Sequence, residues 1–142
     1  MICCVVDASI AVKWFVPESH AISANRLLYD DFELLAPDLI FPEFGNVLWK
    51  KWRRGEISAA SAHGIIEDFR QITIKCYNSQ LFVGEAWGIA ERFGRSFYDS
   101  IYIALAKAQA CHFVTADLKL YNALKNGPLK KHILWIEDIP DA

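Results

Sequence analysis

Residues 2–6 read ICCVV and the run ends at Asp7, so five apolar residues are followed at once by a carboxylate. An uninterrupted apolar run of this length is typical of a strand that is buried on both faces in a parallel sheet. Ligands bind beyond the carboxyl ends of such strands. Asp7 is therefore the first candidate for a functional residue.

Similar patterns continue along the chain and predict alternating strands and helices. β-branched or apolar runs predict further strands at 33–36, 72–77, 112–115 and 133–136. Helical periodicity, caps and breakers predict helices from Asp7 through Trp14 and Phe15, and at 19–29, 42–54, 58–71, 81–93, 97–111 and 118–125. This alternation predicts a three-layer α/β/α sandwich with a mainly parallel central sheet, as a single domain of residues 1–142.

Composition limits the class of protein. Apolar residues make up 54% of the 142 residues and charged residues 23%, which is typical of a folded globular chain. The net charge of −2 gives no overall positive field, so any contact with nucleic acid must come from a local basic patch. No apolar run approaches the ~18 residues of a membrane span, and the N-terminus does not resemble a signal peptide. We expect a cytoplasmic protein without membrane contact.

The four cysteines, Cys3, Cys4, Cys76 and Cys111, lack the paired spacing of a structural zinc site. Cys3 and Cys4 are expected on opposite faces of one strand. We interpret all four as buried apolar residues in a reducing compartment.

Two acids lie immediately or two residues after the ends of predicted strands. Asp7 ends the first strand, and Asp117 follows the strand at 112–115. If these strands are neighbours, both side chains lie at the same edge of the sheet. The alternative is that each acid only caps a helix N-terminus, which stabilises a helix by ~1 kcal/mol.

Two further acids lie in the first turns of predicted helices. Ser96 and Asp99 match a capping box, but Tyr102, Ile103 and Ala106 place Asp99 on an apolar stripe, where a carboxylate needs a partner or a cation. Glu43 follows Pro42 and also borders an apolar side, although it could merely complement the helix dipole.

The four carboxylates together predict more than any of them alone. If Asp7, Glu43, Asp99 and Asp117 converge, their mutual repulsion raises their pKa values unless a divalent cation neutralises them. A ligand set of oxygen atoms without His or Cys suits Mg²⁺ or Mn²⁺. Such an ion can activate water and stabilise the charge on a phosphodiester under attack.

Four segments that carry these acids resemble the acid-bearing motifs of PIN domains, in the same order. They are VVDASIAVKWF at 5–15, APDLIFPEFGNVL at 36–48, FYDSIYIALA at 97–106 and FVTADLKL at 113–120. In the character of these motifs and in its length, the chain is most similar to VapC-like toxins. The resemblance implies an endoribonuclease in which Asp7, Glu43, Asp99 and Asp117 hold Mg²⁺ or Mn²⁺. It also implies that the hydroxyls of Ser9 and Thr115 support the acidic pocket, although local turn or cap bonds would explain them equally.

Several basic residues are candidates for binding RNA phosphates. Lys50 and Arg54, with Lys51 and Arg53, crowd the end of the Glu43 helix, and Lys13 lies near Asp7 in the sequence. A solvated cluster that complements the helix dipole is the alternative for this helix end. Arg92, Arg95 and Lys119 are further candidates.

The resemblance also implies partners. PIN toxins of this kind are held inactive by a VapB-like antitoxin, whose tail lies in an apolar groove near the helices that carry the aromatic residues. We expect Trp14 or Trp49 to contact the antitoxin in this groove. Phe15 and Trp52 are expected to pack in the core. A homodimer is implied in the same way.

Three alternatives remain open from sequence. One is a solitary PIN nuclease without an antitoxin. Another is a receiver or phosphatase-like domain, although phosphatases of the haloacid type need a second acid two residues after the first, where this chain has Ser9. The third is a non-catalytic binding module in which all four acids are caps.

Overall fold

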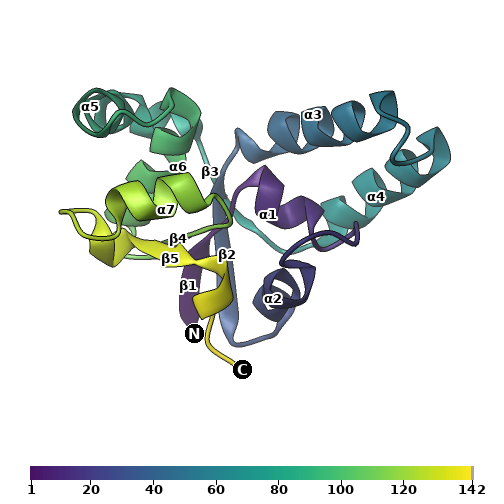
Figure 1. Ribbon diagram of the computed structural model, residues 1–142, viewed down its shortest axis with the longest axis horizontal. Helices are drawn as coiled ribbons and strands as arrows, with labels where there is room; N and C mark the ends of the chain where they lie inside the picture. The colour runs from purple at the N-terminus through teal and green to yellow at the C-terminus, as the bar shows by residue number, and fades with distance from the viewer. Residues whose placement is uncertain (142) are drawn as a thin grey trace.

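The computed structural model describes residues 1–141 and contains a five-stranded parallel sheet with helices on both faces (Figure 1). The strands run in the order β3-β2-β1-β4-β5. Their bounds are β1 Ile2–Val5, β2 Phe32–Pro37, β3 Lys75–Tyr77, β4 His112–Thr115 and β5 Ile133–Trp135. This arrangement confirms the three-layer sandwich, and the sheet is parallel throughout.

Within residues 1–141, seven α-helices connect the strands. They are α1 Ala8–Val12, α2 Ala21–Asn25, α3 Ile40–Arg53, α4 Ala59–Gln71, α5 Val83–Phe93, α6 Phe97–Ala108 and α7 Leu118–Leu124. Four short 3₁₀ turns add η1 Arg26–Leu28, η2 Ser79–Phe82, η3 Lys130–His132 and η4 Ile136–Asp138. No helix within residues 1–141 is long and apolar enough to cross a membrane.

The central strand β1 separates two apolar cores. Cys4 and Val6 belong to the core on one face, whereas Val5 belongs to the core on the other. Helices α1 to α4 contribute to the first core, and α5 to α7 contribute to the second. Alternate residues of a strand point to opposite faces, so a fully apolar strand buries both.

Local signals placed several elements correctly. The strand at 112–115 has the predicted bounds, Ser58 caps α4, and Gly94 ends α5 in the left-handed conformation that glycine favours. The helix after Asp7 was expected to reach Phe15 but ends at Val12. The helix at 19–29 is a short α2 followed by a 3₁₀ turn.

Two expectations about burial are wrong. Helical periodicity over residues 19–29 predicts that Ile22 lies on the apolar side of its helix, but Ile22 is 84% exposed, because α2 is too short to carry a full apolar stripe. Trp52, expected in the core, is 43% exposed, since it lies one turn beyond Leu48, the last apolar residue of α3 that the core covers.

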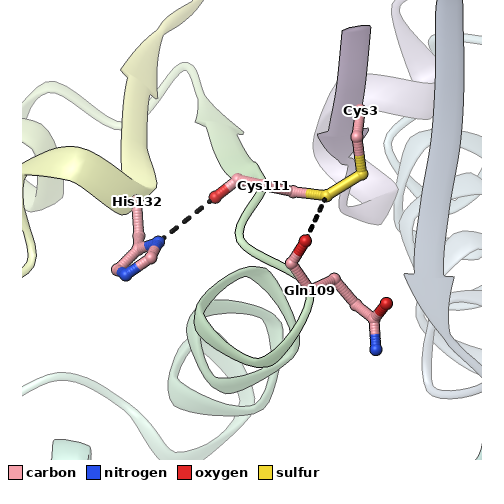
Figure 2. Close-up of a disulfide and its surroundings, with 4 residues drawn as sticks. All are labelled: Cys3, Gln109, Cys111 and His132. Atoms are coloured by element: carbon pink, nitrogen blue, oxygen red, sulfur yellow. Dashed lines mark hydrogen bonds between the residues drawn. A yellow bond between two sulfur atoms is a disulfide. The ribbon is translucent and has the colours of Figure 1, made fainter. Parts of the chain in front are cut away.

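The cysteines also need correction. Cys3 and Cys111 form a disulfide with their Cα atoms 5.3 Å apart (Figure 2), Cys76 is exposed, and only Cys4 is a buried free thiol. The register that pairs Cys4 with His112 brings Cys3 of β1 beside Cys111, which immediately precedes β4. Cys76 is exposed because β3 is an edge strand. The expected opposite orientation of Cys3 and Cys4 is confirmed, since they pack against different cores.

Candidate active site

Asp7 lies just beyond the carboxyl end of β1 and caps helix α1. Its Oδ1 atom accepts hydrogen bonds from the Ile10 amide and the Ser9 hydroxyl, both at 2.9 Å. Oδ1 of Asp7 therefore caps the helix, as one interpretation of the sequence predicted. Oδ2 accepts no hydrogen bond from residues 1–141 and is available to a ligand.

Asp117 has the equivalent position after β4, the neighbour of β1. Its Oδ1 atom accepts a hydrogen bond from the Leu120 amide at 3.2 Å, which caps α7. The buried Thr115 hydroxyl accepts a hydrogen bond from the Asp117 amide at 3.0 Å. Ser9 thus contacts a carboxylate of the predicted site directly, whereas Thr115 shapes the backbone that carries one.

Glu43 and Asp99 enter the same region from opposite layers of the sandwich. Glu43 lies in the first turn of α3, and Asp99 lies in the first turn of α6, where the Ser96 hydroxyl accepts a hydrogen bond from its amide. Tyr102, one turn after Asp99, is buried, as the predicted apolar stripe requires. Its hydroxyl donates a 2.6 Å hydrogen bond to Oε1 of Glu43.

The charges of the four acids act on one another. Burial raises the pKa of Asp7 to about 6, and repulsion from Asp99 and Glu43 adds to that effect. Burial likewise raises the pKa of Glu43, with a further contribution from Asp99. Burial raises the pKa of Asp99 too, Asp117 increases the shift, and Arg95 opposes it. We call Asp7, Glu43, Asp99 and Asp117 the acid cluster, because this repulsion links all four.

The acid cluster suits a divalent cation in its chemistry. All its donors are oxygen atoms, and the repulsion within it is the kind that a bound cation relieves. Within residues 1–141, however, no three His, Cys, Asp or Glu side chains lie close enough together to hold an ion without further adjustment. Carboxylate side chains would have to turn toward a common point on binding.

Three of the cations predicted to contact RNA form ion pairs elsewhere. Lys13 and Lys51 both donate to Glu18, at 3.1 and 2.9 Å, and Arg54 pairs with Glu56. Lys50 is exposed in the last turn of α3. It lies seven residues from Glu43, about 10 Å along the helix axis at ~1.5 Å per residue. The contacts of Lys13, Lys50 and Arg54 with RNA stay predictions.

Arg95 is better placed than these cations. It immediately precedes the cap of α6, and its charge acts on Asp99. Its Nε atom is buried without a hydrogen-bond partner in the described part of the chain. A buried donor left unpaired costs free energy, so this guanidinium is suited to an anionic ligand.

An apolar groove of about 310 Å³ lies between α3 and α4. Leu48, Trp49, Trp52 and Ile66 line it, and the Trp49 side chain is more than half exposed. Trp14 is not among the residues that line it, because its ring packs against the core and its Nε1 donates to the Ala24 carbonyl at 2.9 Å. Of the two tryptophans expected at a partner groove, only Trp49 lines the groove between α3 and α4.

Known proteins of similar sequence and fold agree with this architecture. Residues 4–125 match the model of the PIN domain family. Ribonuclease VapC3 from Pyrobaculum aerophilum is 31% identical over 118 residues, covering 82% of this chain and 90% of that protein. The crystal structure of PAE2754, also from Pyrobaculum aerophilum, covers 96% of this chain and 90% of its own, with a TM-score of 0.71 and 24% identity.

A toxin-antitoxin complex from Klebsiella pneumoniae has a chain of the same fold. Its TM-score is 0.60 at 13% identity, with 92% of this chain and 95% of that chain covered. At such low identity the likeness concerns the fold alone.

Proposed function

The chain belongs to the PIN domain family, and on this premise we propose that it is an endoribonuclease of the VapC kind, acting as the toxin of a toxin-antitoxin pair. The observation that carries the proposal is the acid cluster, in which carboxylates from four separated stretches lie at one edge of the sheet and their repulsion helps to raise the pKa values of Asp7, Glu43 and Asp99. Caps alone would not require Glu43 and Asp99 to approach Asp7. A phosphatase of the haloacid type would need an acid in place of Ser9.

In this proposal Asp7, Glu43, Asp99 and Asp117 hold Mg²⁺ or Mn²⁺. When bound, such an ion supplies an activated water and stabilises the charge that develops on the attacked phosphate. Asp7 and Asp117 come from neighbouring strand ends, so their backbones are fixed by the sheet. The Ser9 hydrogen bond limits the rotation of the Asp7 carboxylate and keeps one of its oxygens engaged.

In this proposal Arg95 binds the phosphate groups of the RNA. A guanidinium forms paired hydrogen bonds to phosphate oxygens, and Arg95 lies beside Asp99 with a donor to spare. It is also the cation whose charge reaches the acid cluster. Lys13 and Arg54, held by Glu18 and Glu56, would need to break ion pairs first.

We further propose that an antitoxin occupies the groove between α3 and α4. Exposed aromatic side chains in a concave apolar surface are typical anchors for a partner segment, and Trp49 is such a side chain. In the Klebsiella pneumoniae structure a chain of the same fold belongs to a toxin-antitoxin complex, and by analogy we assign the partner to the antitoxin class. We likewise propose, from the family resemblance, that the chain forms a homodimer.

RNA cleavage by the purified protein tests the nuclease function. We expect cleavage with added Mg²⁺ or Mn²⁺, none with EDTA, and a loss of at least 100-fold in Asp7→Asn and Asp99→Asn, since each removes a charge from the acid cluster. Far-UV circular dichroism would show that both variants remain folded. Full activity of both variants would refute the assignment of these acids.

A further inference from the structure

The hydrogen bond between Tyr102 and Glu43 joins two layers of the sandwich. Glu43 is on α3, which packs with Phe44 into the core that α1 to α4 cover, whereas Tyr102 belongs to the core on the other face. The phenol donates a hydrogen bond to Oε1 of Glu43 at 2.6 Å. The two residues are 59 positions apart in sequence.

The position of the Tyr102 hydroxyl is fixed by packing. The residue is 1% exposed, and its ring stacks on Phe113 of β4 with centroids 5.7 Å apart and planes inclined by 19°. Phe113 is itself fully buried in a strand two residues before Thr115. The hydroxyl therefore has little freedom to move away from Glu43.

Glu43 has no comparable support of its own. Its side chain is half-buried in the first turn of α3. Within residues 1–141, the Tyr102 hydroxyl is the sole hydrogen-bond donor to its carboxylate. The bond holds Oε1 and leaves Oε2 as the oxygen available to a ligand.

We propose that Tyr102 is a positioning residue that orients the Glu43 carboxylate for the divalent cation of the acid cluster. The inference rests on the proposed function, because it concerns the same site. Groups that hydrogen-bond to metal ligands typically contribute ~10–100-fold to metal affinity. The alternative is that Tyr102 only fills the core, in which case its ring matters and its hydroxyl does not.

Tyr102→Phe separates the two roles, because it keeps the ring and removes the hydroxyl. Binding of Mn²⁺ to the purified protein, measured by isothermal titration calorimetry without RNA, is the main readout. We expect the Kd for Mn²⁺ to rise about tenfold, while the urea midpoint of the metal-free protein stays close to that of the original chain. Cleavage of RNA should recover when the Mn²⁺ concentration is raised by a similar factor. An unchanged Kd would overturn the proposal.

Tyr77→Phe is the matched control. Tyr77 packs, partly buried, against the core that contains the fully buried Tyr102, and its hydroxyl makes no hydrogen bond in the described part of the chain. We expect its Kd for Mn²⁺ to match that of the original chain. An equal loss of affinity in both variants would assign the effect to general packing and overturn the inference.

A double variant tests whether Tyr102 acts through Glu43. Tyr102→Phe should add no further loss of Mn²⁺ affinity in a Glu43→Gln background, and an additive loss would contradict the mechanism. The experiment also separates the inference from the function. If the original chain binds Mn²⁺ but cleaves no RNA, the proposed function fails alone, and if it binds no Mn²⁺, the metal site and this inference fail together.

Discussion

Cys3 and Cys111 are joined by a disulfide at the opposite end of β1 and β4 from Asp7 and Asp117. The same two neighbouring strands therefore carry a covalent crosslink at their start (Figure 2). Two members of the acid cluster lie beyond their other end. This separation predicts that the crosslink affects stability more than the chemistry of the site.

Reduction should destabilise the fold. The crosslinked residues are 108 positions apart, and closing a loop of about 100 residues stabilises by up to ~4–5 kcal/mol in the chain-entropy model. We expect guanidinium unfolding at a clearly lower midpoint with a phosphine reductant, or in a Cys3→Ser/Cys111→Ser variant. Cys76→Ser, which alters an exposed free thiol, is the control and should not move the midpoint. Identical midpoints with and without reductant would contradict the prediction.

Without metal, stability should fall as the pH rises through the range where Asp7 titrates. The pKa of Asp7 is raised to about 6, above the ~3.9 of an unfolded chain, so the folded state binds the proton more tightly. The contribution of Asp7 is therefore present below pH ~4 and is lost by about pH 6.

Asp7→Asn provides the measurement for this pH effect. Asparagine caps a helix as well as aspartate does, but carries no charge. Urea unfolding in EDTA should show Asp7→Asn to be more stable than the original chain by on the order of 1–2 kcal/mol at pH 7.5, with a much smaller difference at pH 4.5. Equal differences at the two pH values would show that Asp7 does not titrate in this range.

Arg95→Ala should weaken RNA binding about tenfold or more, since charge-assisted hydrogen bonds contribute ~1.5–3 kcal/mol. Fluorescence anisotropy with a labelled single-stranded RNA, in the inactive Asp7→Asn background, would measure the Kd. The salt dependence should also decrease by close to one phosphate contact.

Arg54→Ala and Arg70→Ala give the comparison for Arg95. Arg54 pairs with Glu56 at the far end of α3, and the exposed Arg70 pairs with Glu67 on α4. Arg70→Ala should leave RNA binding unchanged. A larger loss of RNA affinity in Arg54→Ala than in Arg95→Ala would contradict the role of Arg95. It would favour RNA binding by the basic residues at the end of α3, as the sequence predicted.

Trp49→Ala should weaken binding of the antitoxin, taken as the product of a short neighbouring reading frame, by at least tenfold. Truncation of a central tryptophan in an interface commonly costs ~2 kcal/mol or more. Trp87→Ala is the control, because Trp87 is comparably exposed but lies on α5, on the other face of the sheet. Equal affinities of Trp49→Ala and the original chain in a pull-down titration would exclude this groove as the docking site.

The sequence predicted the layered fold well because its signals are local. The apolar run before Asp7 indicates a doubly buried strand, and Ser58 and Gly94 mark helix ends through their own backbone preferences. The positions of the four acids at helix starts follow from the same signals. Burial at helix ends was harder to predict, as Trp52 shows, because it depends on how far the opposing element extends.

The sequence by itself thus determined the order of strands and helices and the candidate acids, since each depends on residues a few positions apart. Only the tertiary structure decided that Tyr102 donates to Glu43, that Glu18 binds Lys13 and Lys51, and that Cys3 meets Cys111. These contacts depend on strand order and on how the helical layers pack across the sheet. Many apolar faces could satisfy the same periodicity, so the pattern of one segment does not specify its distant partner.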